Sequence, residues 1–173
     1  MHTLRGGRIK VLQPAHFERV GGTNIMQEPR ASVKTVLVVE DYDDSRFMMA
    51  RLLEMSGYSV LEAADGREAV RVAEGECPDV VLMDLQMPIL DGFTATSLIR
   101  RIESICHVPV IAVSAQSTED FVSAAKRVGC DHFVPKPVDF DLLLDLVREC
   151  TEGAGAGDFA TPLKSVTIRQ PCV

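Results

Sequence analysis

Short apolar segments alternate five times with amphipathic helical segments along the middle of this chain. The apolar segments contain three or four residues each and are rich in β-branched side chains. Each is followed by a stretch with apolar residues at helical spacing, so the pattern predicts five strand–helix units and an α/β fold. The predicted strands are Val36–Val39, Ser59–Glu62, Val80–Met83, Val110–Val113 and His132–Val134, and the predicted helices are Asp44–Ser56, Gly66–Glu74, Phe93–Glu103, Thr118–Val128 and Asp139–Cys150.

The strands lack the alternation of polar and apolar residues that a half-exposed sheet shows. This predicts burial on both faces, and therefore a parallel sheet between two layers of helices. Helical spacing predicts which face of each helix is buried. On the first helix the predicted buried stripe is Met48, Leu52 and Met55.

Charged side chains stand at the ends of three of these strands. Glu40 and Asp41 follow the first strand, Asp84 follows the third, and Lys136 follows the fifth. The carboxyl ends of parallel strands share one edge of an open sheet, where ligands bind. Three carboxylates facing one ammonium suit a divalent cation beside a phosphoryl group, because Mg²⁺ prefers hard oxygen ligands.

The acidic run after the first strand has a second interpretation that involves no metal. Glu40, Asp41, Asp43 and Asp44 are also typical of a solvated acidic turn that precedes a helix. Within that run, Asp44 is expected to cap the helix and Asp43 to lie in solvent. The charged residues at the other strand ends favour the metal interpretation for Glu40 and Asp41.

Composition and charge disfavour several classes of protein. Of the 173 residues, 46% are hydrophobic and 25% charged, which predicts one folded domain with flanking segments. Residues 34–151 carry 21 of the 25 acidic but only 11 of the 18 basic residues, and so acidic a body disfavours nucleic acid as a partner. With no apolar stretch long enough to cross a membrane and no apolar secretory signal, we expect a cytoplasmic protein without a membrane partner.

The two ends of the chain are expected to lie outside the domain of residues 34–151. Residues 1–33 show no sustained periodicity, and we interpret them as a mobile N-terminal extension or a segment upstream of a start near Met26. Residues 152–173 begin as a Gly and Ala linker and end in a tail too short for an output domain, which predicts a stand-alone protein. The five cysteines show no paired spacing and are expected to be thiols.

Over residues 34 to about 150 the chain resembles the receiver domain of two-component response regulators. The matching motifs follow the order and spacing of that family, and together they are specific although each alone is weak. The resemblance implies a flavodoxin-like (βα)5 fold with a five-stranded parallel sheet of order 2-1-3-4-5. The matching stretches are V-L-V-V-E-D, G-Y-S-V-L-E-A-A-D-G-R-E-A-V, D-V-V-L-M-D-L-Q-M-P-I-L-D-G, P-V-I-A-V-S-A and F-V-P-K-P.

The resemblance implies that Asp84 is phosphorylated by a sensor histidine kinase or a histidine phosphotransfer protein. A carboxylate can attack a phosphoryl group only if the two negative charges are screened, which a bridging divalent ion does. The implied cofactor is Mg²⁺, with Mn²⁺ as a substitute. Its implied ligands are the carboxylates of Glu40, Asp41 and Asp84 and the backbone carbonyl of Gln86.

On the other side of the phosphoryl group, hydrogen-bond donors are expected. By resemblance these are the Lys136 ammonium, the Ser114 hydroxyl and the backbone N–H of Ala115. Such donors position and neutralise the transferred group without a general base. The resemblance also implies a cis peptide bond between Lys136 and Pro137.

The predicted function is a phosphorylation-dependent signalling switch and not an enzyme in the ordinary sense. Phosphorylation is expected to draw Ser114 inward and to free space for Phe133, the residue at the family's switch position. Phe lacks the hydroxyl of the Tyr often found there, and plain core packing remains the other interpretation of Phe133. A downstream protein target would bind the fourth helix, fifth strand and fifth helix, residues 118–128 and 133–150.

Two glutamines are expected to set the lifetime of the phosphoryl group. Gln86 is two residues after Asp84, and Gln116 is two residues after Ser114. Their amides can orient a hydrolytic water but cannot act as bases. We therefore expect slow autodephosphorylation.

Three other functions remain as alternatives. A haloacid-dehalogenase-like, Mg²⁺-dependent aspartyl phosphatase would need an acid where this chain has Gln86. An FMN-binding module would need a Ser-, Thr- or Gly-rich loop after the first strand, where residues 40–44 would repel phosphate. The third alternative is a receiver domain that is not phosphorylated and acts as a scaffold.

Overall fold

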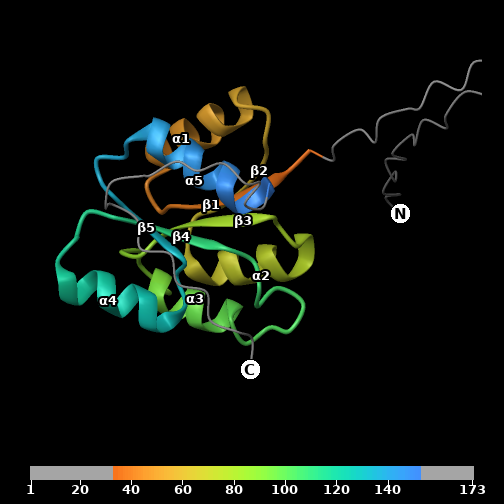
Figure 1. The fold of residues 1–173 in the computed structure, drawn as a ribbon. Coiled ribbons are helices and arrows are strands. Elements are labelled where there is room, and N and C mark those ends of the chain that lie inside the picture. The colour runs from red at the N-terminus through yellow and green to blue at the C-terminus, as the bar shows by residue number, and fades with distance from the viewer. Residues whose placement is uncertain (1–32, 153–173) are drawn as a thin grey trace, which may run out of the picture. The chain divides into compact units, whose positions relative to one another are not determined.

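Five parallel strands and five helices alternate along the part of the chain that the computed structural model describes, residues 33–152 (Figure 1). The predicted N-terminal extension, residues 1–33, and the predicted C-terminal linker and tail, residues 152–173, lie outside the described residues except at Val33 and Glu152. No helix between these two residues is long and apolar enough to cross a membrane. The strands are β1 (Thr35–Val39), β2 (Ser59–Ala63), β3 (Val80–Asp84), β4 (Val110–Ser114) and β5 (His132–Pro135), and the helices are α1 (Asp43–Met55), α2 (Gly66–Glu76), α3 (Gly92–Ile99), α4 (Glu119–Val128) and α5 (Phe140–Glu152).

The strands form one sheet in the order β2-β1-β3-β4-β5, with every neighbouring pair parallel. This confirms the predicted strand order and fold class. β3 and β4 are buried along their whole length, because helices cover both faces of the sheet. The edge strands β2 and β5 are partly exposed.

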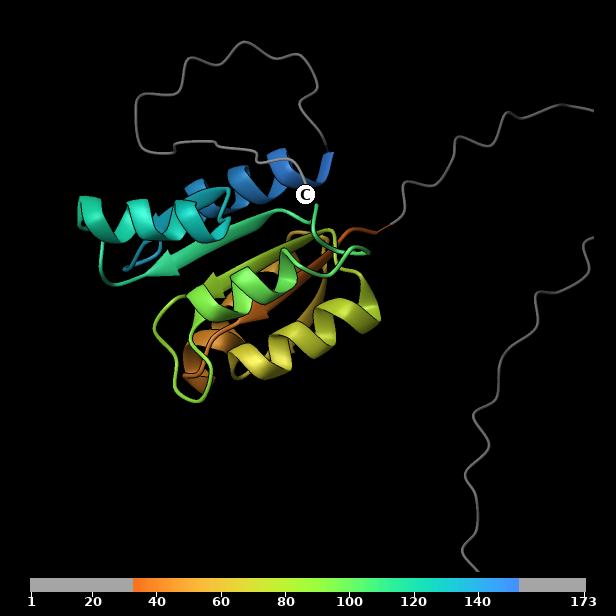
Figure 2. The ribbon, with the colours of Figure 1, turned by 90° about the horizontal axis from the view of Figure 1, so that it is seen from below.

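Alternate residues of each strand face opposite layers of helices. Leu37 and Val39 of β1 pack in the cluster of α2, α3 and α4, whereas Val36 and Val38 pack in that of α1 and α5. Figure 1 shows α1 and α5 on one face of the sheet and the other three helices beneath it. Figure 2 views the lower face and shows α2, α3 and α4 side by side in this order.

The N-terminus of α1 differs from the prediction. The helix begins at Asp43, Tyr42 is the N-cap residue, and no side chain caps the helix. Asp44 therefore lies inside the first turn, and the prediction that it caps the helix is wrong. Asp43 is exposed, as expected, and forms an ion pair with Arg46. Two carboxylates in the first turn still interact favourably with the helix dipole.

The buried face of α1 is rotated relative to the predicted stripe. Met48 and Met55 are 52% and 84% exposed, while Met49, Ala50 and Leu53 are buried. Met49 and Leu53 pack in one cluster with residues of β1 and β3. The predicted stripe is wrong because apolar residues occur almost all the way round this helix between residues 47 and 55. Spacing alone cannot select a face in such a segment.

Helix α3 is shorter than predicted. It ends at Ile99, and the expected continuation to Glu103 is wrong. The chain goes on in tighter turns, in which Arg101 N–H donates to Leu98 O and Ile102 N–H donates to Ile99 O. These turns redirect the chain at the start of the connection to β4.

The expectation about the cysteines is confirmed only in part. Cys77 and Cys130 are free thiols. Cys106 is disulfide-bonded, so the expectation of a thiol is wrong at this position.

Candidate functional site

Four strands end at the same edge of the sheet, and each brings one polar side chain to it. Asp84 is the last residue of β3 and Ser114 is the last of β4. Glu40 directly follows β1, and Lys136 directly follows β5. Because the strands are parallel, residues far apart in the sequence converge at this edge.

Two buried carboxylates share the ammonium group of Lys136. Lys136 Nζ lies 2.6 Å from Asp84 Oδ2 and 2.7 Å from Glu40 Oε2. The side chains of Glu40 and Asp84 are only 3% and 6% exposed. Charge-assisted bonds at this depth are screened little by water, so they fix the three side chains relative to one another.

One ammonium does not fully compensate two buried acids. Burial, only partly offset by the hydrogen bond from Lys136, raises the pKa of Glu40 above its ordinary value, and the charge of Asp84 adds to that effect. Burial also disfavours the charged form of Lys136. Its hydrogen bonds to Asp84 and Glu40 outweigh this effect and raise its pKa. The lysine therefore stays charged while the site retains an excess of negative charge.

The second oxygen of Asp84 is held by the main chain. Asp84 Oδ1 accepts a hydrogen bond of 2.8 Å from the backbone N–H of Gln86. With Oδ2 held by Lys136, both carboxylate oxygens have a fixed direction. Asp84 is thereby oriented at the edge of the sheet before any ligand binds.

Asp41 completes a group of three acids that can hold a cation. Glu40, Asp41 and Asp84 each offer a carboxylate oxygen, and these three oxygens lie within 4.8 Å of one another. Glu40 and Asp84 are buried, whereas Asp41 is exposed. The donor set consists of hard oxygens, and the negative charge of its three carboxylates exceeds the single positive charge of Lys136. Both properties fit a divalent cation such as Mg²⁺.

Arg46 of α1 supports the loop that carries Glu40 and Asp41. Its guanidinium donates to the backbone carbonyl of Glu40 at 2.7 Å and pairs with Asp43 and with Glu62 of β2. The sequence analysis missed this role, because an Arg on a helix gives no sign of the carbonyl that it reaches. The bond anchors the loop after β1 to α1.

Ser114 lies between two glutamines at the end of β4. Its buried hydroxyl oxygen is 3.4 Å from Gln86 Oε1 and accepts a hydrogen bond of 3.3 Å from the backbone N–H of Gln116. Ala115 and Gln116 are exposed at the start of the following loop. Ser114, Gln86 and Gln116 thus occupy one corner of the site, on the β4 side of Asp84.

Lys136 is connected to the end of β4 through its backbone as well. Its N–H donates to Ser114 O at 2.8 Å. The peptide bond between Lys136 and Pro137 is cis, as the resemblance implied. The lysine side chain therefore starts from a backbone position tied to the neighbouring strand.

Phe133 lies on β5 between the core and a cavity. Its side chain is partly buried and packs against the cluster of α2, α3 and α4. It also lines a cavity of about 360 Å³ with Val122 and Ala125 of α4. Core packing and a movable aromatic ring are both compatible with this position.

Gly92 is a second residue whose importance the sequence did not reveal. In the sequence, the Asp91–Gly92 pair is typical of an ordinary turn, in which glycine supplies a left-handed backbone conformation. The backbone of Gly92, however, is not in the left-handed region. A Cβ at Gly92 would lie 2.1 Å from Asp84 O and 2.8 Å from Leu85 Cα. Glycine is required because the start of α3 touches the backbone of Asp84, while Asp91 caps the helix by accepting from Thr94 N–H.

Residues 36–148 match the response regulator receiver domain family. The match covers most of the chain and agrees with the strand order and with the acids and lysine at the sheet edge. The chain therefore belongs to the response regulator receiver domain family of two-component signalling, a family of signalling domains.

Individual relatives agree with this assignment. The chain is 30% identical over 115 residues to the polar-differentiation response regulator DivK of Brucella ovis, covering 66% of this chain and 94% of DivK. It is 38% identical over 131 residues to hybrid signal transduction histidine kinase A of Dictyostelium discoideum, but these cover 73% of this chain and only 6% of the kinase.

Among solved structures, the receiver domain of sensor histidine kinase PA1611 from Pseudomonas aeruginosa superimposes with a TM-score of 0.66 at 31% identity. The superposition covers 70% of this chain and 100% of that domain. That receiver domain has a magnesium ion coordinated in its active-site cleft.

Proposed function

We propose that this chain is a phosphorylation-dependent switch in which Asp84 accepts a phosphoryl group from a sensor histidine kinase or a histidine phosphotransfer protein. The observation that carries the proposal is the pair of short contacts from Lys136 to Asp84 and Glu40 at the sheet edge. Asp84 is oriented in this way beside the ammonium group of Lys136 and two further acids, Glu40 and Asp41. This arrangement equips it for phosphoryl transfer.

In the proposed reaction, an oxygen of Asp84 forms a bond to phosphorus as the phosphorus–nitrogen bond of a phosphohistidine breaks. Lys136 would turn from the carboxylate oxygen to an oxygen of the transferred group, so its charge stays in place during the step. The Ser114 hydroxyl and the Ala115 N–H would bind the remaining oxygens. No proton has to be removed from Asp84, and positioning supplies most of the catalysis.

The acids fit a divalent cation as cofactor. Glu40, Asp41, Asp84 and the carbonyl of Gln86 would hold Mg²⁺, or Mn²⁺ in its place. When bound, the ion would supply the positive charge that three carboxylates and a phosphoryl group together require. The magnesium ion in the related receiver domain from P. aeruginosa supports this assignment.

The proposed switch starts at Ser114. Its hydroxyl contacts Gln86 in the structure, and it would leave this contact to reach the phosphoryl group. Phe133 would then move within the cavity that it lines, and the surface of α4, β5 and α5 would change for a downstream protein target. Gln86 and Gln116 would set how long the phosphoryl group lasts.

Acetyl phosphate with Mg²⁺ tests the proposal directly. The intact mass should increase by one phosphoryl group, and borohydride reduction followed by peptide mapping should place the label on Asp84. Asp84→Asn should abolish the label, whereas the control Asp145→Asn, which removes an exposed carboxylate on α5, should leave it unchanged. A chelator should prevent labelling of the wild-type chain.

The remaining alternatives give different results in the same experiment. A receiver that serves only as a scaffold would keep its unmodified mass. An aspartyl phosphatase would hydrolyse many equivalents of acetyl phosphate, and this is disfavoured because Gln86 stands where that chemistry needs an acid. The cytoplasmic location and a role without nucleic acid or membrane stay part of the proposal.

A further inference from the structure

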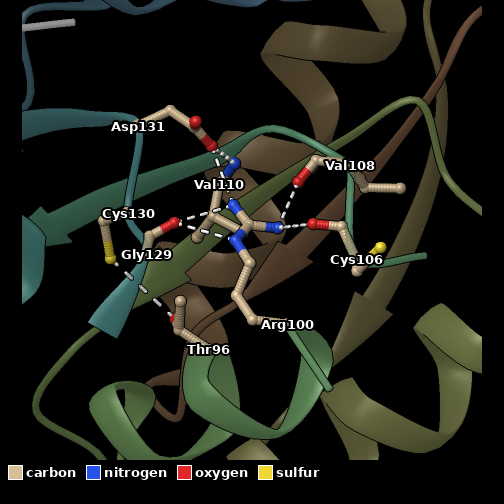
Figure 3. Close-up of polar contacts among 8 residues, drawn as sticks. All are labelled: Thr96, Arg100, Cys106, Val108, Val110, Gly129, Cys130 and Asp131. Atoms are coloured by element: carbon tan, nitrogen blue, oxygen red, sulfur yellow. Dashed lines mark hydrogen bonds and ion pairs between the residues drawn. The ribbon is translucent and has the colours of Figure 1, made fainter. Parts of the chain in front are cut away.

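Arg100, the first residue after α3, uses every hydrogen-bond donor of its guanidinium group. Nη1 donates to the carbonyls of Cys106 and Val108 at 3.0 and 2.7 Å, in the connection between α3 and β4. Nε and Nη2 donate to Gly129 O at 3.0 and 2.7 Å, and Nη2 also donates to Asp131 Oδ2 at 2.8 Å. Figure 3 shows the guanidinium between these two groups of acceptors. Five N–H groups thus make five bonds, which leaves Arg100 no freedom to turn.

This network holds the C-terminal end of α4. Gly129 is the C-cap residue of α4 with φ of 104°, and a Cβ there would lie 2.9 Å from Arg100 Cγ. The N–H groups of Gly129 and Cys130 close the last turn by donating to Lys126 O and Ala125 O, each at 3.0 Å. The end of α4 is therefore bonded internally and seated against the Arg100 side chain.

Asp131 extends the same network into the sheet. Its Oδ2 accepts from Arg100 and also from the backbone N–H of Val110 at 2.8 Å. It thereby joins the beginning of β5 to the beginning of β4. This edge of the sheet is opposite the one that carries Asp84, so the network does not touch the proposed phosphorylation site.

The N-terminal end of α4 is held far less. Thr118 is the N-cap residue, but its side chain makes no capping bond, and residues 115–120 are all exposed. The first ring contact comes at Phe121, which meets Phe93 of α3 edge to face with centroids 5.0 Å apart. Ala125, in the second half, is the buried residue of the helix. Anchoring therefore increases along α4 from the end near Ser114 to the end near Arg100.

Space for movement lies beside α4. The cavity of about 360 Å³ is lined by Val122, Ala125 and Lys126 of α4 and by Phe133 and neighbouring residues of β5. It also reaches Cys130 and Asp131, at the end that Arg100 holds. A helix fixed at one end and bordered by such a cavity can tilt, but it cannot slide without breaking the bonds of Arg100.

We infer that Arg100 is a positioning residue that makes Gly129 the pivot of the switch, so that activation displaces the N-terminal part of α4 while its C-terminal end stays in place. The inference rests on the proposed function and adds the direction of movement and the residue that imposes it. A target protein would then recognise a change of tilt in α4 and not a displacement of the whole helix.

Backbone amide spectra of the full chain, with and without Mg²⁺ and beryllofluoride as a phosphoryl analogue, test this inference. In the wild-type chain the amides of Ala115–Val122 should shift strongly, and those of Gly129 and Cys130 should shift at least several-fold less. Shifts of equal size along the whole of α4 would refute the pivot at Gly129 but not the proposed function. Absence of any change around Asp84 would refute the proposed function and with it the pivot.

Two matched variants separate a pivot from simple stabilisation. In Arg100→Gln, beryllofluoride should shift the amides of Gly129 and Cys130, and their hydrogen exchange should be faster by about tenfold or more. The control Arg101→Gln removes the charge of the neighbouring exposed arginine and should keep the wild-type pattern. A folded Arg100→Gln with the wild-type pattern overturns the inference. If Arg100→Gln does not fold, the wild-type spectra still decide.

Discussion

Lys136 Nζ lies 2.6 Å from Asp84 Oδ2, although the two residues are separated by 52 positions in the sequence. The same nitrogen lies 2.7 Å from Glu40 Oε2. Asp84, the proposed phosphoryl acceptor, is therefore paired with the ammonium group of Lys136 before any phosphate arrives.

Replacing Lys136 by Met should lower the free energy of unfolding by about 3 kcal/mol near neutral pH. Two buried carboxylates would then face each other without their shared counter-charge, and breaking a buried ion pair has a penalty of this size. Urea denaturation measures the change. Lys136→Arg, which keeps the charge, should lose less than half as much, and a Lys136→Met chain as stable as wild type would contradict the prediction.

Glu40→Gln should change the pH dependence of stability. The pKa of Glu40 in the folded chain is raised above its ordinary value of 4.5 by burial, so the folded state binds its proton more tightly than the unfolded state. The resulting stabilisation is present below pH 4.5 and is lost as pH rises through the raised pKa. Glutamine does not titrate, so the variant does not lose this stabilisation. Its free energy of unfolding relative to wild type should therefore increase as pH rises from 4.5 through the raised pKa of Glu40.

Unfolding curves at several pH values between acid and neutral provide the measurement. The control is Asp145→Asn, which removes an exposed carboxylate on α5. A difference between Glu40→Gln and wild type that is constant with pH would rule the prediction out.

Gly92→Ala should destabilise the chain by about 2 kcal/mol and slow labelling of Asp84. The added Cβ would meet the backbone oxygen of Asp84 at 2.1 Å, so the loop or the end of β3 has to move. Gly75→Ala in α2 is the matched control, because nothing lies within 4 Å of its Cβ position. That variant should gain about 0.5 kcal/mol from helix propensity. Equal stabilities of the two variants would contradict the close approach at Gly92.

The phosphoryl group on Asp84 should last for minutes or longer. Gln86 and Gln116 flank the site, and neither amide can take a proton from an attacking water. The decay of the phosphorylated mass after removal of acetyl phosphate measures the lifetime. A half-life of seconds would show that another group activates the water.

Much of the fold was predictable because the strands are apolar throughout and the helices alternate with them. That pattern, with the right-handed crossover rule, brings Glu40, Asp84 and Lys136 to one edge. The same reasoning could not orient α1. With apolar residues on nearly every side of that helix, its buried face depends on how it packs against the sheet, and Met49 and Leu53 are buried where Met48 and Met55 were expected.

The missed features involve contacts between backbone and distant side chains. Gly92 touches the backbone of Asp84, and Arg100 reaches the carbonyl of Gly129, 29 residues along the chain. Neither contact leaves a periodic signal, because a carbonyl acceptor can belong to any residue type. Such contacts become visible only when the elements are placed in space.

The exposure of Asp41 has a consequence for how the site exchanges its cation. Two of the three acids are buried and one lies at the surface, so an ion bound among them has an open route to bulk water. Occupancy should then follow the surrounding concentration of free Mg²⁺ without delay. The two packed clusters that cover the faces of the sheet are apolar and do not depend on a bound ion, so withdrawing the ion should silence the site and leave the protein folded.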